Sequence, residues 1–189
     1  MINQEKKALR KRYKSLRDSV AHMQFQSDNM YNVLIDSDIY KNADTVLLYW
    51  SYGSEVRTHR MIDKALADGK AVALPRCLDS DGNMQFYLIK SLSDLSDGMY
   101  GIKEPETDIV ADDFTCDSLC VVPGLSFSYE GYRLGYGKGY YDRFLDKFKG
   151  LSVGLCYEEC LTDYLPTDRY DKKVNYIISN NTIIKIKEE

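Results

Sequence analysis

The residues best suited to chemistry lie in a glycine-rich segment in the second half of the chain. Gly135, Gly137 and Gly139 alternate there with other residues, and Arg133 and Lys138 lie among them. Glycines lack a Cβ, so successive backbone N–H groups can turn toward one anion without steric hindrance. A helix predicted to begin at residue 140 would add the positive end of its dipole. Together with the two cations, this arrangement favours a di- or triphosphate as the ligand.

Asp142 falls in the first turn of that predicted helix. A carboxylate beside phosphates is repulsive unless a divalent cation lies between them, which indicates a metal–nucleotide site. Asp168 and Asp171 are candidates for a second carboxylate. Two structural alternatives stay open: Asp142 complements the helix dipole, an effect of about 0.3–1 kcal/mol, and the glycines form flexible turns. The glycine spacing matches neither a Walker motif nor a dinucleotide-binding fingerprint.

The first seventeen residues form a basic segment on an otherwise acidic chain. They contain seven Lys or Arg and one Glu, while the formal net charge of the whole chain is −4. Helical spacing predicts an apolar stripe with cations beside it, the stripe being Leu9, Tyr13, Leu16 and Val20 and the cations Lys6, Arg10, Lys14 and Arg17. These cations either line a pocket for a small anion or form a solvated helix face. The acidic remainder argues against a broad nucleic-acid surface.

The elements that must position these residues are indicated by apolar runs alternating with helical patterns. Residues 45–50, 71–74, 119–122, 151–156 and 176–179 are predicted strands buried on both faces, with further candidates at 84–88 and 183–186. Helices are expected over the N-terminal segment, around 30–35, at 57–68 and at 140–148. Residues 90–117 are expected to form loops with a short helix. Strands alternating with helices favour a mostly parallel sheet. The length of 189 residues favours one α/β domain, residues 1–189.

Composition excludes several protein classes. Hydrophobic residues make up 44% of the chain and charged residues 29%, which excludes disorder and coiled coils. No apolar run approaches the ~20 residues of a membrane span, and the charged N-terminus is unlike a secretory signal, so a cytoplasmic protein is expected. Five cysteines then predict reduced thiols. Cys116/Cys120 and Cys156/Cys160 have the spacing of a possible four-thiolate zinc site, but Cys120 and Cys156 lie inside apolar runs and are interpreted as small hydrophobes.

The segment 123–145 resembles the signature of the 5-formyltetrahydrofolate cyclo-ligase family, through its run Arg-Leu-Gly-x-Gly-x-Gly-Tyr-Tyr-Asp-Arg-Phe. Other parts of the chain are similar to that family in order and distance. They are Lys6-Lys7-Ala8-Leu9-Arg10, Glu55-Val56-Arg57-Thr58, Pro75-Arg76, Gly101-Ile102-x-Glu104-Pro105, and Pro166 followed by Asp171. The resemblance extends over nearly the whole chain.

The resemblance implies a single three-layer domain with a mostly parallel, Rossmann-like sheet of the NagB/RpiA/CoA-transferase type. It also implies an ATP-dependent ligase that converts 5-formyltetrahydrofolate into 5,10-methenyltetrahydrofolate and releases ADP and phosphate with Mg²⁺. The formyl oxygen is phosphorylated, the neighbouring folate nitrogen attacks the activated carbon, and phosphate leaves. Phosphoryl transfer needs positioning and charge neutralisation more than a protein nucleophile, so a chain with two histidines suits it.

The resemblance also implies roles for particular residues. ATP would be bound by Lys6, Lys7, Arg10, Arg133, Leu134, Gly135, Tyr136, Gly137, Lys138, Gly139, Tyr140 and Tyr141. The folate, possibly polyglutamylated, would contact Tyr52, Glu55, Tyr136, Gly137, Lys138, Gly139 and Tyr140. Arg133, Lys138 and Tyr140 would be catalytic, and Asp142 and Asp171 would hold magnesium. Arg76 and Glu104 would lie in the pocket without an assigned role. A monomer or weak dimer is expected, with no membrane or nucleic-acid partner.

Some of these assignments have structural alternatives. Glu55 would cap the helix that starts near Arg57, and Tyr141 is expected in the core with Tyr140 in the pocket. Arg57 and Asn175 depart from the family pattern, which more often has acidic residues at both positions. Two other functions stay open: a nucleotide- or RNA-binding module without turnover, and a CoA or sugar-phosphate enzyme on a similar scaffold.

Overall fold

The computed structural model describes residues 2–79, 82–98 and 101–187, and its centre is a seven-stranded sheet. The strand order is β12-β11-β9-β6-β1-β2-β3. Along the chain these strands are β1 (Thr45–Leu47), β2 (Ala71–Cys77), β3 (Met84–Ile89), β6 (Ser118–Val122), β9 (Leu151–Leu155), β11 (Tyr176–Ser179) and β12 (Thr182–Lys185). The five inner strands are parallel, and only the edge strands β3 and β12 pair antiparallel. The predicted mostly parallel sheet is confirmed.

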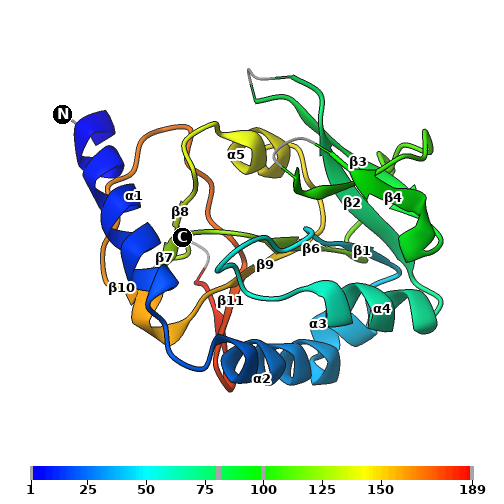
Figure 1. Ribbon diagram of the computed structural model, residues 1–189, viewed down its shortest axis with the longest axis horizontal. Helices are drawn as coiled ribbons and strands as arrows, with labels where there is room; N and C mark the ends of the chain where they lie inside the picture. Colours follow the sequence, from blue (N-terminus) through cyan, green and yellow to red (C-terminus); the bar gives the residue numbers. More distant parts are fainter. Residues whose placement is uncertain (1, 80–81, 99–100, 188–189) are drawn as a thin grey trace.

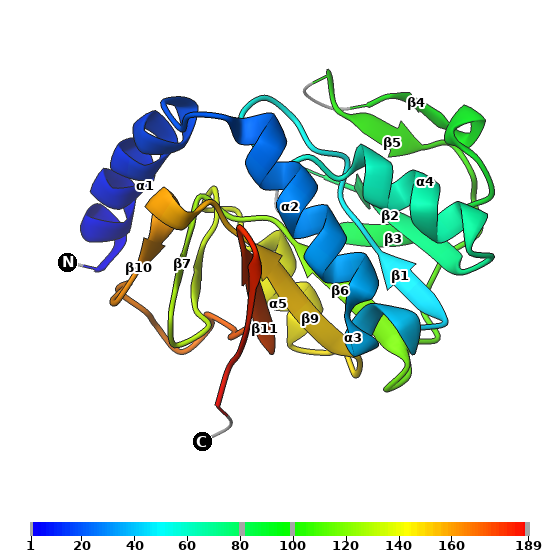
Figure 2. The same ribbon diagram turned by 90° about the horizontal axis from the view of Figure 1, so that it is seen from below.

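The inner strands are buried because helices cover both faces of the sheet, as expected for parallel strands. All five residues of β6 are buried. Figure 1 shows α2 (Met23–Asp36), α3 (Asp38–Lys41) and α4 (His59–Ala67) on one side and α5 (Tyr140–Leu145) on the other. Figure 2 shows α2 and α4 lying across the sheet. This is the three-layer α/β arrangement that the sequence predicted.

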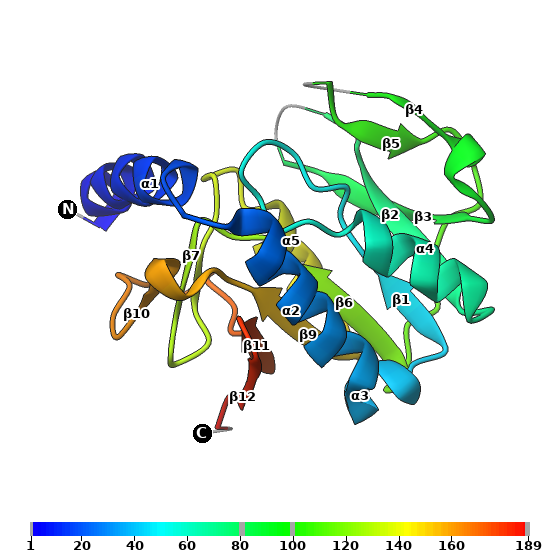
Figure 3. The same cartoon turned by 60° about the horizontal axis from the view of Figure 1, so that its bottom comes forward.

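Helix α1 (Ile2–Asp18) stands apart from these layers. In Figures 1 and 3 it lies beside a small three-stranded sheet rather than on the central one. That small sheet has the order β10-β7-β8, with β7 at Ser126–Ser128, β8 at Arg133–Leu134 and β10 at Leu161–Thr162. Its position lets α1 reach the glycine-rich segment, which begins directly after β8.

Several elements differ from the sequence predictions. The strand predicted at 45–50 ends at Leu47, and the helix predicted at 140–148 ends at Leu145. The expected strand-to-helix loop contains the β7–β8 hairpin, and residues 90–117 contain the strands β4 (Leu95–Asp97) and β5 (Lys103–Pro105) besides the short helix η1 (Leu92–Asp94). These strands are two or three residues long, which is too short for an alternating pattern to identify. A second short helix, η3 (Glu158–Cys160), follows β9.

Aromatic side chains anchor α5 to the sheet. Phe144 lies 4.7 Å from Phe86 of β3 and 5.6 Å from Phe114 between ring centroids, and Phe148 lies 5.3 Å from Phe114. Tyr141 is buried, as expected from its helical phase. The position of Asp142 at the start of α5 is therefore set by the core. No helix in the described part of the chain has the length and apolarity needed to cross a bilayer.

Candidate active site

The glycine-rich loop occupies residues 135–139, between β8 and α5. Gly137 and Gly139 have φ values of +101° and +72°, a region that side-chain-bearing residues rarely adopt. Gly135 lets a guanidinium approach closely, since a Cβ there would lie 2.5 Å from Nη1 of Arg133, which would have to shift. The alternating glycines thus meet two demands, a left-handed backbone and close approach of a guanidinium. The interpretation as merely flexible turns does not account for the close approach.

Arg133 and Asp142 form a buried ion pair beneath this loop. Nη2 of Arg133 donates to Oδ2 of Asp142 at 2.9 Å, and the arginine side chain is 5% exposed. Its guanidinium lies 5.4 Å from the Tyr141 ring centroid. Nε of Arg133 is buried and has no hydrogen-bond partner among the described residues. A buried donor without an acceptor is costly, so this nitrogen is an unsatisfied group beneath the loop.

Helix α1 directs two predicted ATP-binding cations into the same region. Nε of Arg10 donates to the carbonyl of Gly135 at 2.9 Å, and its guanidinium packs against Gly137. Lys6 is buried and pairs with Asp171 at 2.5 Å and Asp168 at 3.1 Å. Burial lowers the pKa of Lys6, but the hydrogen bonds to the two aspartates outweigh it, so the pKa is raised.

The two other basic residues predicted beside them on α1 do not join this cluster. Lys7 and Lys14 are exposed, and neither forms a hydrogen bond or ion pair with the described residues. The helix turns about 100° per residue, so Lys7 faces away from the side that Lys6 occupies.

Arg17 is a buried cation that the sequence reasoning did not assign to the site. Its Nη2 donates to the Tyr136 hydroxyl at 2.7 Å, and Nη1 donates to the Gly124 carbonyl at 3.2 Å. The Tyr136 hydroxyl in turn donates to Oε1 of Glu55 at 2.9 Å. The spacing of Lys6, Arg10 and Arg17 along one helix face was the available signal, because Arg10 and Arg17 contact the loop and Lys6 contacts the two aspartates.

Glu55 does not cap α4, contrary to the structural alternative considered for it. Oε2 of Glu55 accepts a bond from the backbone N–H of Tyr52 at 3.0 Å, which closes a turn before the helix. Thr58 is the N-cap residue of α4, and its side chain does not cap the helix. Burial raises the pKa of Glu55, and the Tyr52 N–H, the Tyr136 hydroxyl and Arg17 oppose that rise. The carboxylate is therefore held toward the glycine-rich loop.

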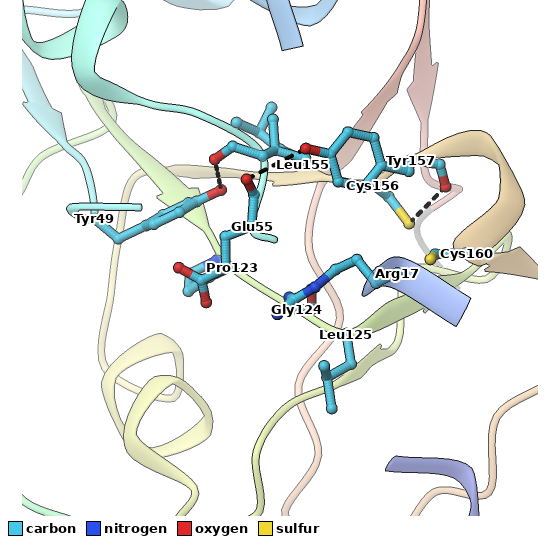
Figure 4. Close-up of a pocket in the computed structure, with 11 residues that line it drawn as sticks. Arg17, Tyr49, Glu55, Pro123, Gly124, Leu125, Leu155, Cys156, Tyr157 and Cys160 are labelled. Carbon is cyan, nitrogen blue, oxygen red and sulfur yellow. Dashed lines mark hydrogen bonds between the residues drawn. The ribbon is translucent and has the colours of Figure 1, made fainter. Parts of the chain in front are cut away.

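Glu55 and Arg17 line a narrow pocket at the carboxyl ends of β1, β6 and β9 (Figure 4). Its walls include Tyr49, Gly124, Leu155 and Tyr157, which follow or end these strands. The Tyr157 hydroxyl donates to the Glu55 carbonyl at 3.3 Å, and the Tyr49 hydroxyl donates to the Val56 carbonyl at 3.0 Å. Ligands of open α/β sheets bind at this edge. The pocket itself has no room for a water molecule.

Beyond the loop, Tyr140 and Arg143 connect α5 to residues that follow β2. The Tyr140 hydroxyl donates to the Asp79 carbonyl at 3.1 Å, and Nη2 of Arg143 donates to the carbonyls of Gly82 and Lys138. Tyr140 is half-buried while Tyr141 is buried, as predicted. Arg143 was not predicted to have a role, yet it ties the glycine-rich loop to the segment after β2.

Asp142 and Asp171, the predicted magnesium ligands, come from adjacent segments. The backbone N–H of Lys172 donates to Oδ1 of Asp142 at 3.4 Å, which places the residue following Asp171 against Asp142. Carboxylate oxygens are the ligands that Mg²⁺ prefers, so the donor set fits that ion. Both carboxylates are neutralised by cations in this structure, Asp142 by Arg133 and Asp171 by Lys6. Among the described residues no group of three or more His, Cys, Asp or Glu could hold a metal ion.

The remaining candidate residues lie farther from this cluster. Arg76 stacks on Tyr87 at 3.7 Å and donates to the Pro105 carbonyl, and Glu104 accepts from the Cys77 backbone N–H. Both therefore connect β2 and β3 with β5. The five cysteines are free thiols, and Cys120, Cys156 and Cys160 are buried.

The two positions that depart from the family pattern have structural partners. Oδ1 of Asn175 accepts from the Ser152 backbone N–H and hydroxyl, both at 2.8 Å, and so links β9 to the start of β11. The Arg57 backbone N–H donates to the Ser27 hydroxyl, which holds the segment before α4 against α2.

Comparisons with known proteins agree with the geometry. The model of the 5-formyltetrahydrofolate cyclo-ligase family matches residues 2–180. A probable 5-formyltetrahydrofolate cyclo-ligase of Schizosaccharomyces pombe is 29% identical over 176 residues, covering 85% of this chain and 86% of the relative. The 5-formyltetrahydrofolate cyclo-ligase of Escherichia coli K12 is 31% identical over 147 residues, covering 75% and 80%.

Solved structures give the same result. The structure of 5,10-methenyltetrahydrofolate synthetase from Aquifex aeolicus matches with a TM-score of 0.84 at 29% identity, covering 97% of this chain and 94% of that one. A 5,10-methenyltetrahydrofolate synthetase from Mycoplasma pneumoniae, at 23% identity and a TM-score of 0.69, shares the fold. The resemblance carried by the glycine-rich segment is thereby confirmed, and the chain belongs to the 5-formyltetrahydrofolate cyclo-ligase family.

Proposed function

We propose that this protein closes the ring of 5-formyltetrahydrofolate to give 5,10-methenyltetrahydrofolate at the cluster formed by α1, the glycine-rich loop and residues 52–55. Its family membership makes it an ATP-dependent ligase of folate one-carbon metabolism. The observation that carries the assignment of the site is the loop 135–139, which Arg10 and Arg133 contact on one side while Tyr136 reaches Glu55 on the other.

The ATP phosphates would bind at the loop and the cations around it. Backbone N–H groups of residues 135–139 and the side chains of Arg10, Lys138 and Arg133 would supply the donors. Lys6 lies next to them and would exchange an aspartate for a phosphate oxygen. Leu134 and Tyr141 are buried beneath the loop, so their contribution to ATP binding would come from supporting its backbone.

Asp142 and Asp171 would hold Mg²⁺ with the ATP phosphates. When bound, the ion would neutralise the charge that develops during phosphoryl transfer. Each carboxylate is paired with a cation that could instead bind a phosphate oxygen, Asp171 with Lys6 and Asp142 with Arg133. Binding of the magnesium–ATP complex would therefore redistribute these ion pairs rather than bury new unpaired charge.

The folate would lie on the Glu55 side of the loop. A carboxylate can accept from the amino and ring N–H donors of the pterin, and Glu55 is held for this by the Tyr52 backbone N–H and the Tyr136 hydroxyl. The formyl oxygen would then approach the terminal phosphate of ATP across the loop. Arg133, Lys138 and Tyr140 would stabilise the transferring phosphoryl group and orient the formyl group, so that no protein nucleophile is needed.

One assay tests this proposal directly. The purified protein is incubated with MgATP and 5-formyltetrahydrofolate, and the methenyl product is followed by its near-ultraviolet absorbance. We expect ATP-dependent formation of the product in proportion to enzyme. A folded protein that gives no signal, or a signal without ATP, would overturn the proposal.

The cellular setting follows from the same proposal. We expect a cytoplasmic protein that acts as a monomer or weak dimer and has no nucleic-acid partner, with polyglutamylated folate among its possible substrates. A nucleic-acid-binding module would instead show binding with a steep salt dependence and no turnover.

A further inference from the structure

Arg17 is a buried charge without a direct carboxylate partner. Its residue is 5% exposed, and it forms no ion pair with the described residues. Isolated charges are costly to bury unless hydrogen bonds compensate them. Three of its donors are used, on Ser54 Oγ at 3.1 Å, the Gly124 carbonyl and the Tyr136 hydroxyl. All three acceptors are neutral, and they belong to three separate loops.

The Tyr136 hydroxyl links this charge to Glu55. Because a guanidinium only donates, the hydroxyl oxygen accepts from Arg17 and its hydrogen is directed to Oε1 of Glu55. The Arg17 guanidinium also lies 5.7 Å from the centroid of the Tyr136 ring. The chain Arg17–Tyr136–Glu55 therefore joins α1, the glycine-rich loop and the turn at residues 52–55.

These contacts lie between the proposed ATP phosphate site at the glycine-rich loop and the proposed folate site at Glu55. Tyr136 is exposed on the surface of the glycine-rich loop, so its hydroxyl is not needed to fill the core. A tyrosine held at this point by a buried arginine fixes the carboxylate of Glu55 in one arrangement. Such pre-organisation lowers the cost of ordering the site when ligands bind.

We propose that Arg17 is a positioning residue, which acts through the Tyr136 hydroxyl to hold Glu55 in the geometry that binds the folate. The inference rests on the proposed function, since it names the residue that orients its folate-binding carboxylate. It predicts that Arg17 and Tyr136 act as one unit toward the folate and contribute less to binding of ATP.

A double-mutant cycle tests this coupling. Arg17→Met, Tyr136→Phe and the double variant are compared with wild type by KM for 5-formyltetrahydrofolate and for ATP, and by equilibrium dialysis of the folate without ATP. We expect each single variant to raise KM for the folate about tenfold. The KM of the double variant should be no higher than that of the more strongly affected single variant. KM for ATP should change less than about twofold. Arg12→Met on the exposed face of α1 and Tyr164→Phe on the surface are the matched controls.

The pH dependence of folate binding gives a readout that a merely structural arginine would not move. Glu55 is faced by Arg17 from α1, Tyr136 from the loop, Tyr49 from the segment after β1 and Tyr141 from α5, and the tyrosines stay neutral near pH 7. Removing Arg17 or the Tyr136 hydroxyl takes away an influence that lowers the pKa of Glu55. The acidic limb of folate binding should therefore move to higher pH in both variants.

The outcomes separate this inference from the proposed function. The positioning role would be overturned if the effects of the two substitutions on KM for the folate multiplied independently, or if KM rose equally for the folate and ATP. Turnover by the wild type would still uphold the proposed function. Absence of folate binding by wild type would overturn both. If Arg17→Met does not fold, Tyr136→Phe decides alone, since an unchanged folate KM and pH profile in that variant would contradict the inference.

Discussion

The helices α1 and α5 both direct charged groups to the active site, but different forces hold them. The buried residues of α1 are Lys6, Tyr13 and Arg17, two of which are cations bonded to loops. The buried residue of α5 is Tyr141, and its neighbour Phe144 packs in an aromatic cluster. α1 combines an apolar stripe packed on the core, formed by Leu9, Tyr13 and Leu16, with buried cations bonded to loops, whereas an aromatic cluster holds α5.

This difference bears on how each helix responds to ligands. Aromatic packing is lost only when the core opens, so we expect Asp142 on α5 to keep its position when substrates bind. The ion pairs of Lys6 can instead be exchanged for phosphate oxygens at little net cost. We infer that α5 is the fixed part of the phosphate site, and that α1 adjusts to the nucleotide.

The largest expected effect concerns the anchor of α5. Phe86 is 1% exposed and contacts both Tyr141 and Phe144. Phe86→Ala should lower the free energy of unfolding by about 3–5 kcal/mol, because it leaves a cavity under the helix. Urea denaturation measures the loss, with Leu92→Ala on the surface as control. A loss below about 1 kcal/mol would mean that the aromatic cluster does not anchor α5.

The second effect concerns Asp142, the carboxylate on α5 that is proposed to hold Mg²⁺. Asp142→Asn should lower kcat about 100-fold and raise the Mg²⁺ concentration needed for half-maximal rate, because a neutral amide binds the ion poorly and leaves Arg133 unpaired. Magnesium titrations at saturating ATP measure both. Asp146→Asn, at the other end of the same helix, removes a surface ion pair with Lys172 and should leave both unchanged. Unchanged metal dependence in Asp142→Asn would reduce Asp142 to a partner of Arg133 and the helix dipole.

The third effect concerns the cations of α1 and the glycine-rich loop that are proposed to bind ATP. Arg10→Ala and Lys138→Ala should each weaken ATP binding about tenfold and folate binding less than twofold, because charge-assisted contacts to phosphate are lost. Isothermal titration with a non-hydrolysable ATP analogue measures this. Lys14→Ala, an exposed cation on α1, is the control. Equal losses for both ligands would show that these side chains are structural.

The smallest effect is a pH-dependent change in stability at Glu55. Burial raises the pKa of this carboxyl above its ordinary value of 4.5. A raised pKa contributes stability at low pH that is lost as the pH rises through the folded-state value. Glu55→Gln should therefore gain stability relative to wild type as the pH rises from about 4 to about 7, while folate binding weakens. Urea midpoints at both pH values measure the gain, and Glu158→Gln is the exposed control. A constant difference between the two pH values would contradict the prediction.

The sequence predicted the layers of the fold well because they depend on long apolar patterns. The runs that became β2, β6, β9 and β11 are nearly continuous hydrophobic stretches, and α1 has a clear helical stripe. The strands β4, β5, β7, β8 and β10 were missed, because two or three residues carry no periodicity. The end of β1 at Leu47 was also missed, since residues 48–50 are apolar but already belong to the loop that leads to Glu55.

Within the site, the residue types by themselves were enough to predict the ligand chemistry. Alternating glycines, Arg133 and Lys138 indicate phosphate, and Asp142 indicates a cation, because these groups have the same chemistry wherever they lie. Only the tertiary structure decided which groups meet. It paired Lys6 with Asp171, left Lys7 in solvent and brought Arg17 to Tyr136 across 119 positions of sequence. Such contacts depend on how α1 docks against loops from three distant segments, and no local pattern encodes that geometry.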